Sequence, residues 1–522
     1  MISRLHQHVI GASLFLMLVG NFTFFQKLHD LYASNLGFVC SVTLVFVSAT
    51  AFVLNLLCHG RLTKWVLSFA VLVASICAYF MDTYGTVIDV PMLNNMLQTN
   101  WSEATDLLSA PFFLRMLFLG VIPIVCIFRF SEYKDQTLRH IKSLVFTNSI
   151  LFIAIVIAVF LSSSQYASFF REHKSVRFYS NPSYPIYSII KLSSQFLHSN
   201  IDSVISKIAE DARIVEEKTA PKELMIVVVG ETARADHFSL NGYSRETNPR
   251  LKKENVLSFK NVTACGTSTA ISVPCMFSAI GSEYFSVEKA KNTMNALDVL
   301  ADRGVDILWR DNNSDSKNVA TRVHYEDFKT SDKNPVCDVE CRDEGMLVGL
   351  DEYIKERRGK DVLIVLHQMG NHGPAYYKRY PSHFEKFVPT CKTNELASCS
   401  NQEIQNAYDN AILYTDYFLS KVIELLKRHD KSFETAMLYV SDHGESLGEY
   451  GMYLHGAPKR FAPREQTHVP AVFWSGQQFE YSVADLKPYE NMKLSHDHLF
   501  CSLMVAYEVE TNVCSTWNFV RH

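Results

Sequence analysis

The chain has 522 residues, enough for two or three domains, and a formal net charge of -4 that gives no sign of nucleic-acid binding. Apolar segments gather in the first third of the sequence, whereas charged residues and glycines gather in the rest. The sequence therefore predicts a membrane-embedded part followed by a water-exposed part.

Five segments in the first third are apolar and long enough to cross a bilayer, which takes roughly 20 residues. The first segment could instead be a signal peptide, because it is N-terminal. Its apolar run is long, however, few basic residues precede it, and no clear cleavage site follows it. The five predicted spans are residues 9–25, 36–57, 65–80, 112–128 and 143–161.

Basic residues in the short connections predict the orientation, because loops rich in Lys and Arg remain in the cytoplasm. Such residues lie between spans two and three and between spans four and five, whereas residues 81–110 contain none. The N-terminus, with Arg4, resembles the basic loops. We therefore expect a cytoplasmic N-terminus, with the 81–110 loop and everything after the fifth span outside.

Eight of the 12 cysteines follow the last predicted span, and they occur as four pairs that are close in sequence. In an oxidising compartment this pattern indicates four disulfides with short loops. A zinc knuckle is the alternative, but no C-x-x-C motif occurs. Orientation and cysteine usage thus independently predict a C-terminal part outside a bacterial inner membrane. The eight residues are Cys265, Cys275, Cys337, Cys341, Cys391, Cys399, Cys501 and Cys514.

The 81–110 loop contains three polar residues at a spacing of four, namely Asn95, Thr99 and Glu103. A helix would place them on one face and the neighbouring Met and Leu residues on another. One interpretation is an amphipathic helix that lies on the membrane. The other is that the polar face holds a substrate headgroup. Residues 164–220 mix aromatic with basic side chains, which predicts short interfacial helices and a linker.

Four short apolar runs in the C-terminal part predict buried strands, at residues 225–229, 306–309, 362–366 and 437–440. Ligands of α/β sheets bind outside the carboxyl ends of the strands, so one sheet edge would gather the residues that follow these runs. Carboxylates and imidazoles together indicate a divalent metal, with zinc the most suitable, although each residue alone could be a turn or a helix cap. The residues are Glu231, then Asn313, Ser314 and Lys317, then His367 and His372, then Asp442 and His443, with His455 in the next loop.

The stretch 261–276 places small and hydroxylic residues between two cysteines, which predicts a tight loop that opens a helix. A helix N-terminus favours anions such as phosphate. Thr267, Ser268 and Thr269 are all candidate nucleophiles, and a bound metal would activate any of these hydroxyls. The alternative is a Ser/Thr-rich helix cap. Near the C-terminus, S-H-D-H at 495–498 looks metal-binding but is better explained as a helix start.

Six long segments are distinctive: V-V-V-G-E-T-A-R-A-D-H, C-G-T-S-T-A-I-S-V-P-C-M-F-S, L-W-R-D-N-N-S-D-S-K, H-Q-M-G-N-H-G-P-A-Y, Y-V-S-D-H-G-E-S-L-G-E-Y-G-M-Y-L-H-G, and D-T-Y-G-T-V at residues 82–87. Together they resemble the phosphoethanolamine–lipid A transferases, the group that includes the mobile colistin resistance enzymes. The likeness covers nearly the whole chain. It implies a five-helix transmembrane domain at 1–163 and a periplasmic α/β domain at 221–522, similar to alkaline phosphatases and sulfatases, with a central mixed sheet. Interfacial helices and a linker at 164–220 would connect them.

The resemblance also implies roles for the candidate residues. Thr269 would be the nucleophile and, with Glu231, Asp442 and His443, would bind one catalytic zinc ion. Residues expected to contact phosphate or a second zinc are Lys317, His372 and His455, while His367, Asn313 and Ser314 would line the site. Residues expected to contact the donor headgroup are Asn95, Thr99 and Glu103.

Three disulfides are implied by the resemblance: Cys265–Cys275, Cys337–Cys341 and Cys391–Cys399. The Cys337–Cys341 loop is shorter than the family pattern. Cys501 and Cys514 have no counterpart in that pattern, and we expect them to form an additional disulfide.

The implied activity is transfer of phosphoethanolamine from phosphatidylethanolamine to a lipid A phosphate through a phospho-threonine, with polymyxin (colistin) resistance as the outcome. The implied protein is a monomer in the inner membrane of a Gram-negative bacterium. One alternative is transfer of phosphoethanolamine or phosphoglycerol to another glycan or protein, and another is a zinc phosphodiesterase with water as acceptor. A transporter or receptor is disfavoured, because the predicted spans carry few ionisable residues.

Overall fold

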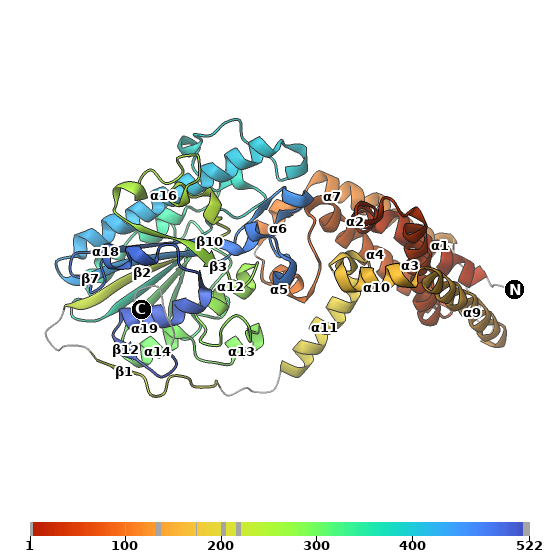
Figure 1. Ribbon diagram of the computed structural model, residues 1–522, viewed down its shortest axis with the longest axis horizontal. Coiled ribbons are helices and arrows are strands. Elements are labelled where there is room, and N and C mark those ends of the chain that lie inside the picture. The colour runs from red at the N-terminus through yellow and green to blue at the C-terminus, as the bar shows by residue number, and fades with distance from the viewer. Residues whose placement is uncertain are drawn as a thin grey trace. The chain divides into compact units, whose positions relative to one another are not determined.

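The computed structural model (Figure 1) describes residues 4–99, 101–130, 137–173, 175–199, 205–215 and 221–514. The chain divides into two compact units. The helical unit comprises Met1–Leu93 and Leu108–Leu197, and the sheet unit comprises Asn94–Leu107 and His198–His522. The 81–110 loop is therefore divided, because its central segment packs with the sheet unit.

The helical unit consists of helices joined by short connections. Its described elements are α1 (Arg4–Gly20), α2 (Phe22–Tyr32), α3 (Leu36–Leu57), α4 (Leu62–Tyr84), the start of α5 (Val90–Gln98), α7 (Ala110–Arg115), the π-helix η1 (Met116–Val121), α8 (Ile122–Phe130), α9 (Thr137–Leu161), α10 (Ser163–Glu172), η2 (Val176–Tyr179) and most of α11 (Ser183–Ser199). Among the described residues, four helical stretches are long and apolar enough to cross a membrane, and the bent pair α1–α2 would make a fifth.

The first predicted span, residues 9–25, contains a bend. Its helix ends at Gly20, and α2 continues at an angle of 70° to α1. Asn21 lies at the bend, where its side-chain amide donates to the Asn181 carbonyl (2.7 Å) and its side-chain oxygen accepts from the Asn181 backbone N–H (2.8 Å). These buried bonds fix the bend against Asn181. The Asn181 side-chain amide also donates to the Gly20 carbonyl at 2.9 Å, which gives a partner to a backbone group that a continuous helix would satisfy itself.

The predicted helix through the polar residues of the 81–110 loop is wrong. Helix α5 ends at Gln98, Thr99 lies outside it, and α6 (Trp101–Leu107) begins two residues later. Thr99 Oγ1 donates to the Asn95 carbonyl at 2.8 Å, so the hydroxyl caps the end of α5. The side chain of Glu103 lies outside the described residues.

The sheet unit is built on an eight-stranded mixed sheet with the order β11-β3-β10-β7-β2-β6-β4-β5. Strands β7, β2, β6, β4 and β5 run parallel, whereas β10 is antiparallel to both β7 and β3. The strands of this sheet are β2 (Lys222–Gly230), β3 (Leu257–Thr263), β4 (Asp306–Asp311), β5 (His324–Asp327), β6 (Val362–His367), β7 (Phe433–Ser441), β10 (His468–Ser475) and β11 (Leu494–Ser495).

Helices cover both faces of the sheet. In Figure 1, α16 lies along one face and α14 and α19 along the other. The central strands are buried on both sides, which explains their unbroken apolar runs. Besides α6 and short 3-10 turns, this unit contains α12 (Thr269–Met276), α13 (Val287–Lys291), α14 (Ala296–Asp302), α15 (Leu350–Lys355), α16 (Asn401–His429), α17 (Arg464–Thr467), α18 (Val483–Leu486), α19 (Leu499–Ala506), and the short strands β1 (Arg213–Ile214), β8 (Ser446–Leu447), β9 (Tyr453–Leu454) and β12 (Val509–Glu510).

Four disulfides lie in the sheet unit, and they join the four pairs expected from the sequence. They are Cys265–Cys275, Cys337–Cys341, Cys391–Cys399 and Cys501–Cys514. The last pair ties α19 to the segment that follows β12 and is the one absent from the family pattern. The four free cysteines belong to the helical unit.

Candidate active site

The parallel register of the central strands brings the candidate residues to one edge of the sheet. Gly230 at the end of β2 lies opposite Ser441 at the end of β7, so the next residues, Glu231 and Asp442, are neighbours. His367 at the end of β6 lies opposite Asp311 at the end of β4. The loops that leave these strands therefore converge, as the alignment of their carboxyl ends requires.

Two carboxylates and an imidazole form the centre of the site. His443 Nε2 lies 3.3 Å from Glu231 Oε1 and 3.3 Å from Asp442 Oδ2, and all three side chains are fully buried. The imidazole Nδ1–H donates to the Gly444 carbonyl at 2.9 Å, which leaves Nε2 free to act as a ligand. These three residues can offer ligand atoms that lie within 4.8 Å of one another, so we define them as the metal cluster.

The electrostatics of the metal cluster fit a divalent cation. Burial raises the pKa of Asp442 to about 7, and the neighbouring Glu231 carboxylate contributes to this rise. Two adjacent buried carboxylates repel each other unless a proton or a cation lies between them. Asp442 Oδ2 is buried and has no hydrogen-bond donor among the described residues. A donor set of two carboxylates, one imidazole and a nearby hydroxyl fits a tetrahedral zinc site.

The hydroxyl comes from the first residue of α12. Thr269 Oγ1 donates to Glu231 Oε2 at 3.1 Å and lies 3.4 Å from His443 Nε2. Thr267, another candidate nucleophile, instead donates to the Ala457 carbonyl at 2.6 Å, and Ser268 is the N-cap residue of the helix. The Cys265–Cys275 disulfide closes the loop around these residues. Of the three hydroxyls, Thr269 is therefore the one in contact with the metal cluster.

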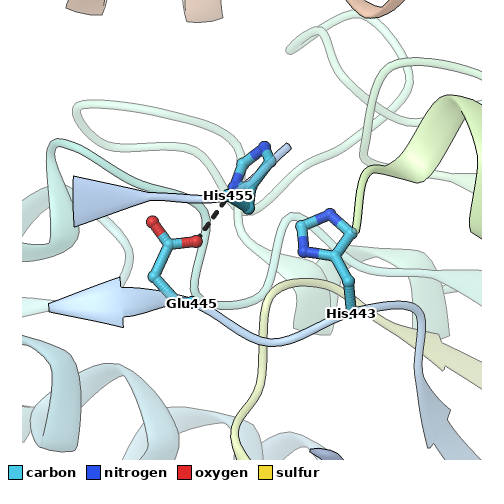
Figure 2. A group of neighbouring side chains, drawn as sticks. All are labelled: His443, Glu445 and His455. Carbon is cyan, nitrogen blue, oxygen red and sulfur yellow. Dashed lines mark hydrogen bonds and ion pairs between the residues drawn. The ribbon is translucent and has the colours of Figure 1, made fainter. Parts of the chain in front are cut away.

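A second group of ligand-type side chains adjoins the first. Figure 2 shows His443, Glu445 and His455, with a hydrogen bond of 2.9 Å between His455 Nδ1 and Glu445 Oε2. The His455 ring centroid lies 4.3 Å from that of His443 and 5.5 Å from that of His372. Burial raises the pKa of Glu445 to about 8, against the opposing effect of a hydrogen bond from Tyr376. Sequence reasoning missed Glu445, although it lies only three residues after Asp442.

The loop after β4 orients the metal cluster. Asn313 Nδ2 donates to Glu231 Oε2 (2.8 Å) and to the Gln368 carbonyl (2.7 Å), and Ser314 Oγ donates to the Asn313 side chain. His367 bonds to Asp311 through Nδ1, and its Nε2 is buried without a hydrogen-bond partner among the described residues. The contacts of Asn313 hold the carboxylate of Glu231 in one orientation.

Lys317 lies in the same loop and is 3% exposed, so it is not an ordinary surface lysine. Its ammonium group donates to the Ser314 carbonyl (3.0 Å) and to the Gln98 carbonyl (3.2 Å) at the end of α5. The segment that carries Asn95 and Thr99 thus contacts a residue at the edge of the site. Contact of these residues with a substrate remains a prediction.

A second contact holds the same segment through α6. Asp106 is buried, and its carboxylate accepts from Arg379 Nη2 at 2.9 Å and from the Lys378 ammonium group. Arg379 Nε also donates to the His372 carbonyl at 2.6 Å. One arginine therefore connects the segment 94–107 with the loop that carries His372.

The S-H-D-H stretch is confirmed as a helix start. Ser495 is the N-cap residue of a capping box, and α19 follows at Leu499. His496 is nevertheless close to the site: its Nδ1 accepts from the Cys265 N–H at 3.0 Å, and its Nε2 donates to the Ser441 carbonyl at 2.9 Å. It joins the loop that precedes α12 to the end of β7. Sequence spacing carries no signal for such a bridge.

Gly444 offers a direct test of this packing. A Cβ at this position would lie 2.0 Å from the Glu465 carbonyl oxygen, so Gly444→Ala must displace the backbone beside Asp442 and His443. We expect the metal content and the activity of this variant to fall by more than about tenfold, because ligands must be held close to their working geometry. Metal analysis and a thermal melt of the purified protein measure the effect. Full metal content in a stable variant would contradict the expected displacement.

Family comparisons match both units. A family model described as phosphoethanolamine transferase EptA/EptB matches residues 46–196, and the Sulfatase model matches residues 223–508. Over 514 residues the chain is 46% identical to phosphatidylethanolamine transferase Mcr-2 of Escherichia coli, a match that covers 95% of this chain and 94% of that protein. Phosphoethanolamine transferase EptA of Escherichia coli K12 is 38% identical over 520 residues, 96% of this chain and 93% of that protein.

Solved structures agree with these matches. The integral membrane lipooligosaccharide phosphoethanolamine transferase A of Neisseria meningitidis superposes with a TM-score of 0.93 and 32% identity, over 98% of this chain and 97% of that chain. The C-terminal periplasmic domain of phosphoethanolamine transferase EptC of Campylobacter jejuni is 44% identical, and the match covers 60% of this chain and 95% of that chain, with a TM-score of 0.54.

Proposed function

Because the chain belongs to the phosphoethanolamine transferase family, we propose that it transfers phosphoethanolamine from phosphatidylethanolamine to a phosphate group of lipid A. The observation that carries this proposal is the contact of Thr269 Oγ1 with Glu231 and His443 at the edge of the sheet. A hydroxyl in that position can attack phosphorus once its pKa is lowered. A zinc ion held by Glu231, Thr269, Asp442 and His443 would lower that pKa and draw charge from the phosphate oxygens.

The reaction proceeds in two transfers. In the first, Thr269 Oγ attacks the donor phosphorus, the bond from phosphorus to the glycerol oxygen breaks, and diacylglycerol leaves with the proton that the hydroxyl lost. Phosphoethanolamine is then esterified to Thr269. In the second, a lipid A phosphate oxygen attacks the same phosphorus and Thr269 Oγ leaves. Because each step transfers one phosphoryl group, the atoms balance without a further reactant.

Other residues of the site support these steps. Asn313 holds Glu231 through its side-chain amide, so the carboxylate stays aligned with Thr269 Oγ. Lys317, His372 and His455 are proposed to contact phosphate oxygens, where positive charge or N–H donors favour the spread of charge in the transition state. A second zinc ion at His455 and His372 is the alternative role for this group.

The location of the enzyme follows from its substrates. Both are lipids, which explains why a sulfatase-like unit is attached to apolar helices. We place the protein in the bacterial inner membrane as a monomer, with the N-terminus in the cytoplasm and the sheet unit in the periplasm. The product carries a zwitterionic group in place of a phosphate charge, which weakens binding of cationic peptides. Polymyxin (colistin) resistance is the expected phenotype.

Mass spectrometry of lipid A from cells that express the protein tests the acceptor. We expect lipid A to gain the mass of phosphoethanolamine and the polymyxin tolerance of the cells to rise. If lipid A is unmodified and another glycan or a protein carries phosphoethanolamine, that molecule is the acceptor and lipid A is not. Release of free ethanolamine phosphate without any modified product would instead indicate hydrolysis.

A further inference from the structure

One strongly basic surface beside the site has no role in the chemistry described so far. The loop 456–464 follows His455 directly, contains Lys459, Arg460 and Arg464, and has no acidic residue. All three basic side chains are exposed. In the described part of the chain none of them forms an ion pair, and Asp497 attracts Lys459 only at longer range. We call this segment the basic loop.

The basic loop is fixed against the loop that precedes α12. Gly456 N–H donates to the Thr267 carbonyl at 2.7 Å, and Thr267 Oγ1 donates to the Ala457 carbonyl at 2.6 Å. Gln466, which is 2% exposed, accepts from the Ala457 N–H and donates to the Leu454 carbonyl, so it closes the base of the loop. The start of the basic loop is therefore hydrogen-bonded to Thr267, two residues before Thr269, which keeps the cations close to the site.

The basic loop also presents an apolar side chain. Phe461 is 40% exposed and lies between Arg460 and Arg464 in sequence. Cationic groups together with an exposed ring suit an anionic amphiphile, whose headgroup carries the charge and whose chains are apolar.

We propose that the basic loop is the surface that binds the phosphorylated acceptor lipid and brings its phosphate group to Thr269. This inference rests on the proposed function. Charge distinguishes the acceptor from the donor: a phosphate monoester carries roughly -1.5 to -2 at neutral pH, whereas phosphatidylethanolamine has no net charge. Three cations that form no ion pair with any described residue favour the former, because they gain nothing from a zwitterion at long range.

The test separates the two transfers in the full-length protein. In the first, the enzyme receives phosphatidylethanolamine alone, and diacylglycerol release and the mass of the Thr269 peptide are measured. In the second, lipid A in neutral detergent micelles is added and transfer is followed. The variant is Arg460→Gln with Arg464→Gln, compared with Arg460→Lys and Arg464→Lys. The matched control, Arg358→Gln with Lys360→Gln, removes two charges before β6 begins, at the opposite end of the strand from the site.

We expect the Gln variant to load Thr269 at the wild-type rate and to lose about tenfold in kcat/KM for lipid A, mainly through KM and with a weaker dependence on salt. The Lys variant should keep most of the activity, and the control should keep all of it. Equal losses in both transfers, or the same loss in the control, would overturn the proposal. The second transfer is also measured in vesicles that contain phosphatidylglycerol. A loss found only there would overturn the proposal too, because the loop would then bind the membrane surface. If the wild-type enzyme never forms the phosphoethanolamine adduct on Thr269, the proposed function is wrong, and this inference, which rests on it, is wrong as well.

Discussion

Thr269→Ala is expected to abolish transfer, with a loss of about a thousandfold or more in kcat/KM. The variant has no side-chain oxygen to form the phosphate ester, so neither transfer can occur. The fold should persist, because Ala is a strong helix former and position 269 begins α12. Diacylglycerol release from phosphatidylethanolamine measures the first transfer, and lipid A modification measures the second.

Thr269→Ser is the matched control for this prediction. It keeps the hydroxyl that contacts Glu231 and His443 and removes only a methyl group, so partial activity should remain. A phosphoethanolamine adduct on the peptide that carries the substituted position would then show that the oxygen there is the acceptor. Lipid modification that survives in Thr269→Ala would disprove the assignment of the nucleophile.

Removal of the metal should have a comparable effect. We expect a chelator to lower activity by more than about a hundredfold and zinc to restore it, because Thr269 is a poor nucleophile without a cation on its oxygen. The protein should also melt at a lower temperature, since two buried carboxylates then lie together without a compensating charge. Metal analysis and a thermal melt with and without chelator measure both effects.

Asp442→Asn separates the two consequences of metal removal. This variant loses a ligand and should be inactive, but it also loses one of the two repelling charges. Its melting temperature should therefore change little when the chelator is added, unlike that of the wild type. Asp332→Asn, at an exposed position, should behave as the wild type in both measurements. Full activity in chelator would contradict a metal-dependent mechanism.

The sheet and the candidate ligands at its edge could be predicted because their signals are local. Each central strand is a short apolar run, and the residues that follow it are of the ligand type, so the parallel sheet gathers Glu231, Asp442 and His443. Spacing alone could not choose among Thr267, Ser268 and Thr269. That choice came from a family resemblance, and in the structure the choice depends on contacts with residues far along the chain.

The features that sequence reasoning missed depend on long-range partners. The bend at Asn21 is held by Asn181, 160 residues away. The break after Gln98 ends a helix that the spacing of polar residues favoured. His496 links two loops through backbone groups, and no side-chain pattern marks the residues that it contacts.

The attachment of the segment 94–107 to the sheet unit makes that unit discontinuous in the chain. Asp106 leaves the ribosome about 270 residues before its partner Arg379, which at bacterial synthesis rates is roughly 15 to 50 s. During that interval a carboxylate that will be buried has neither of its cations. The sheet unit therefore cannot be completed before Arg379 has been synthesised, and a fragment that begins at residue 221 would lack the segment 94–107. Folding of this protein in the cell thus requires the segment 94–107 to remain unpaired until the later part of the same polypeptide, with Arg379, has been synthesised.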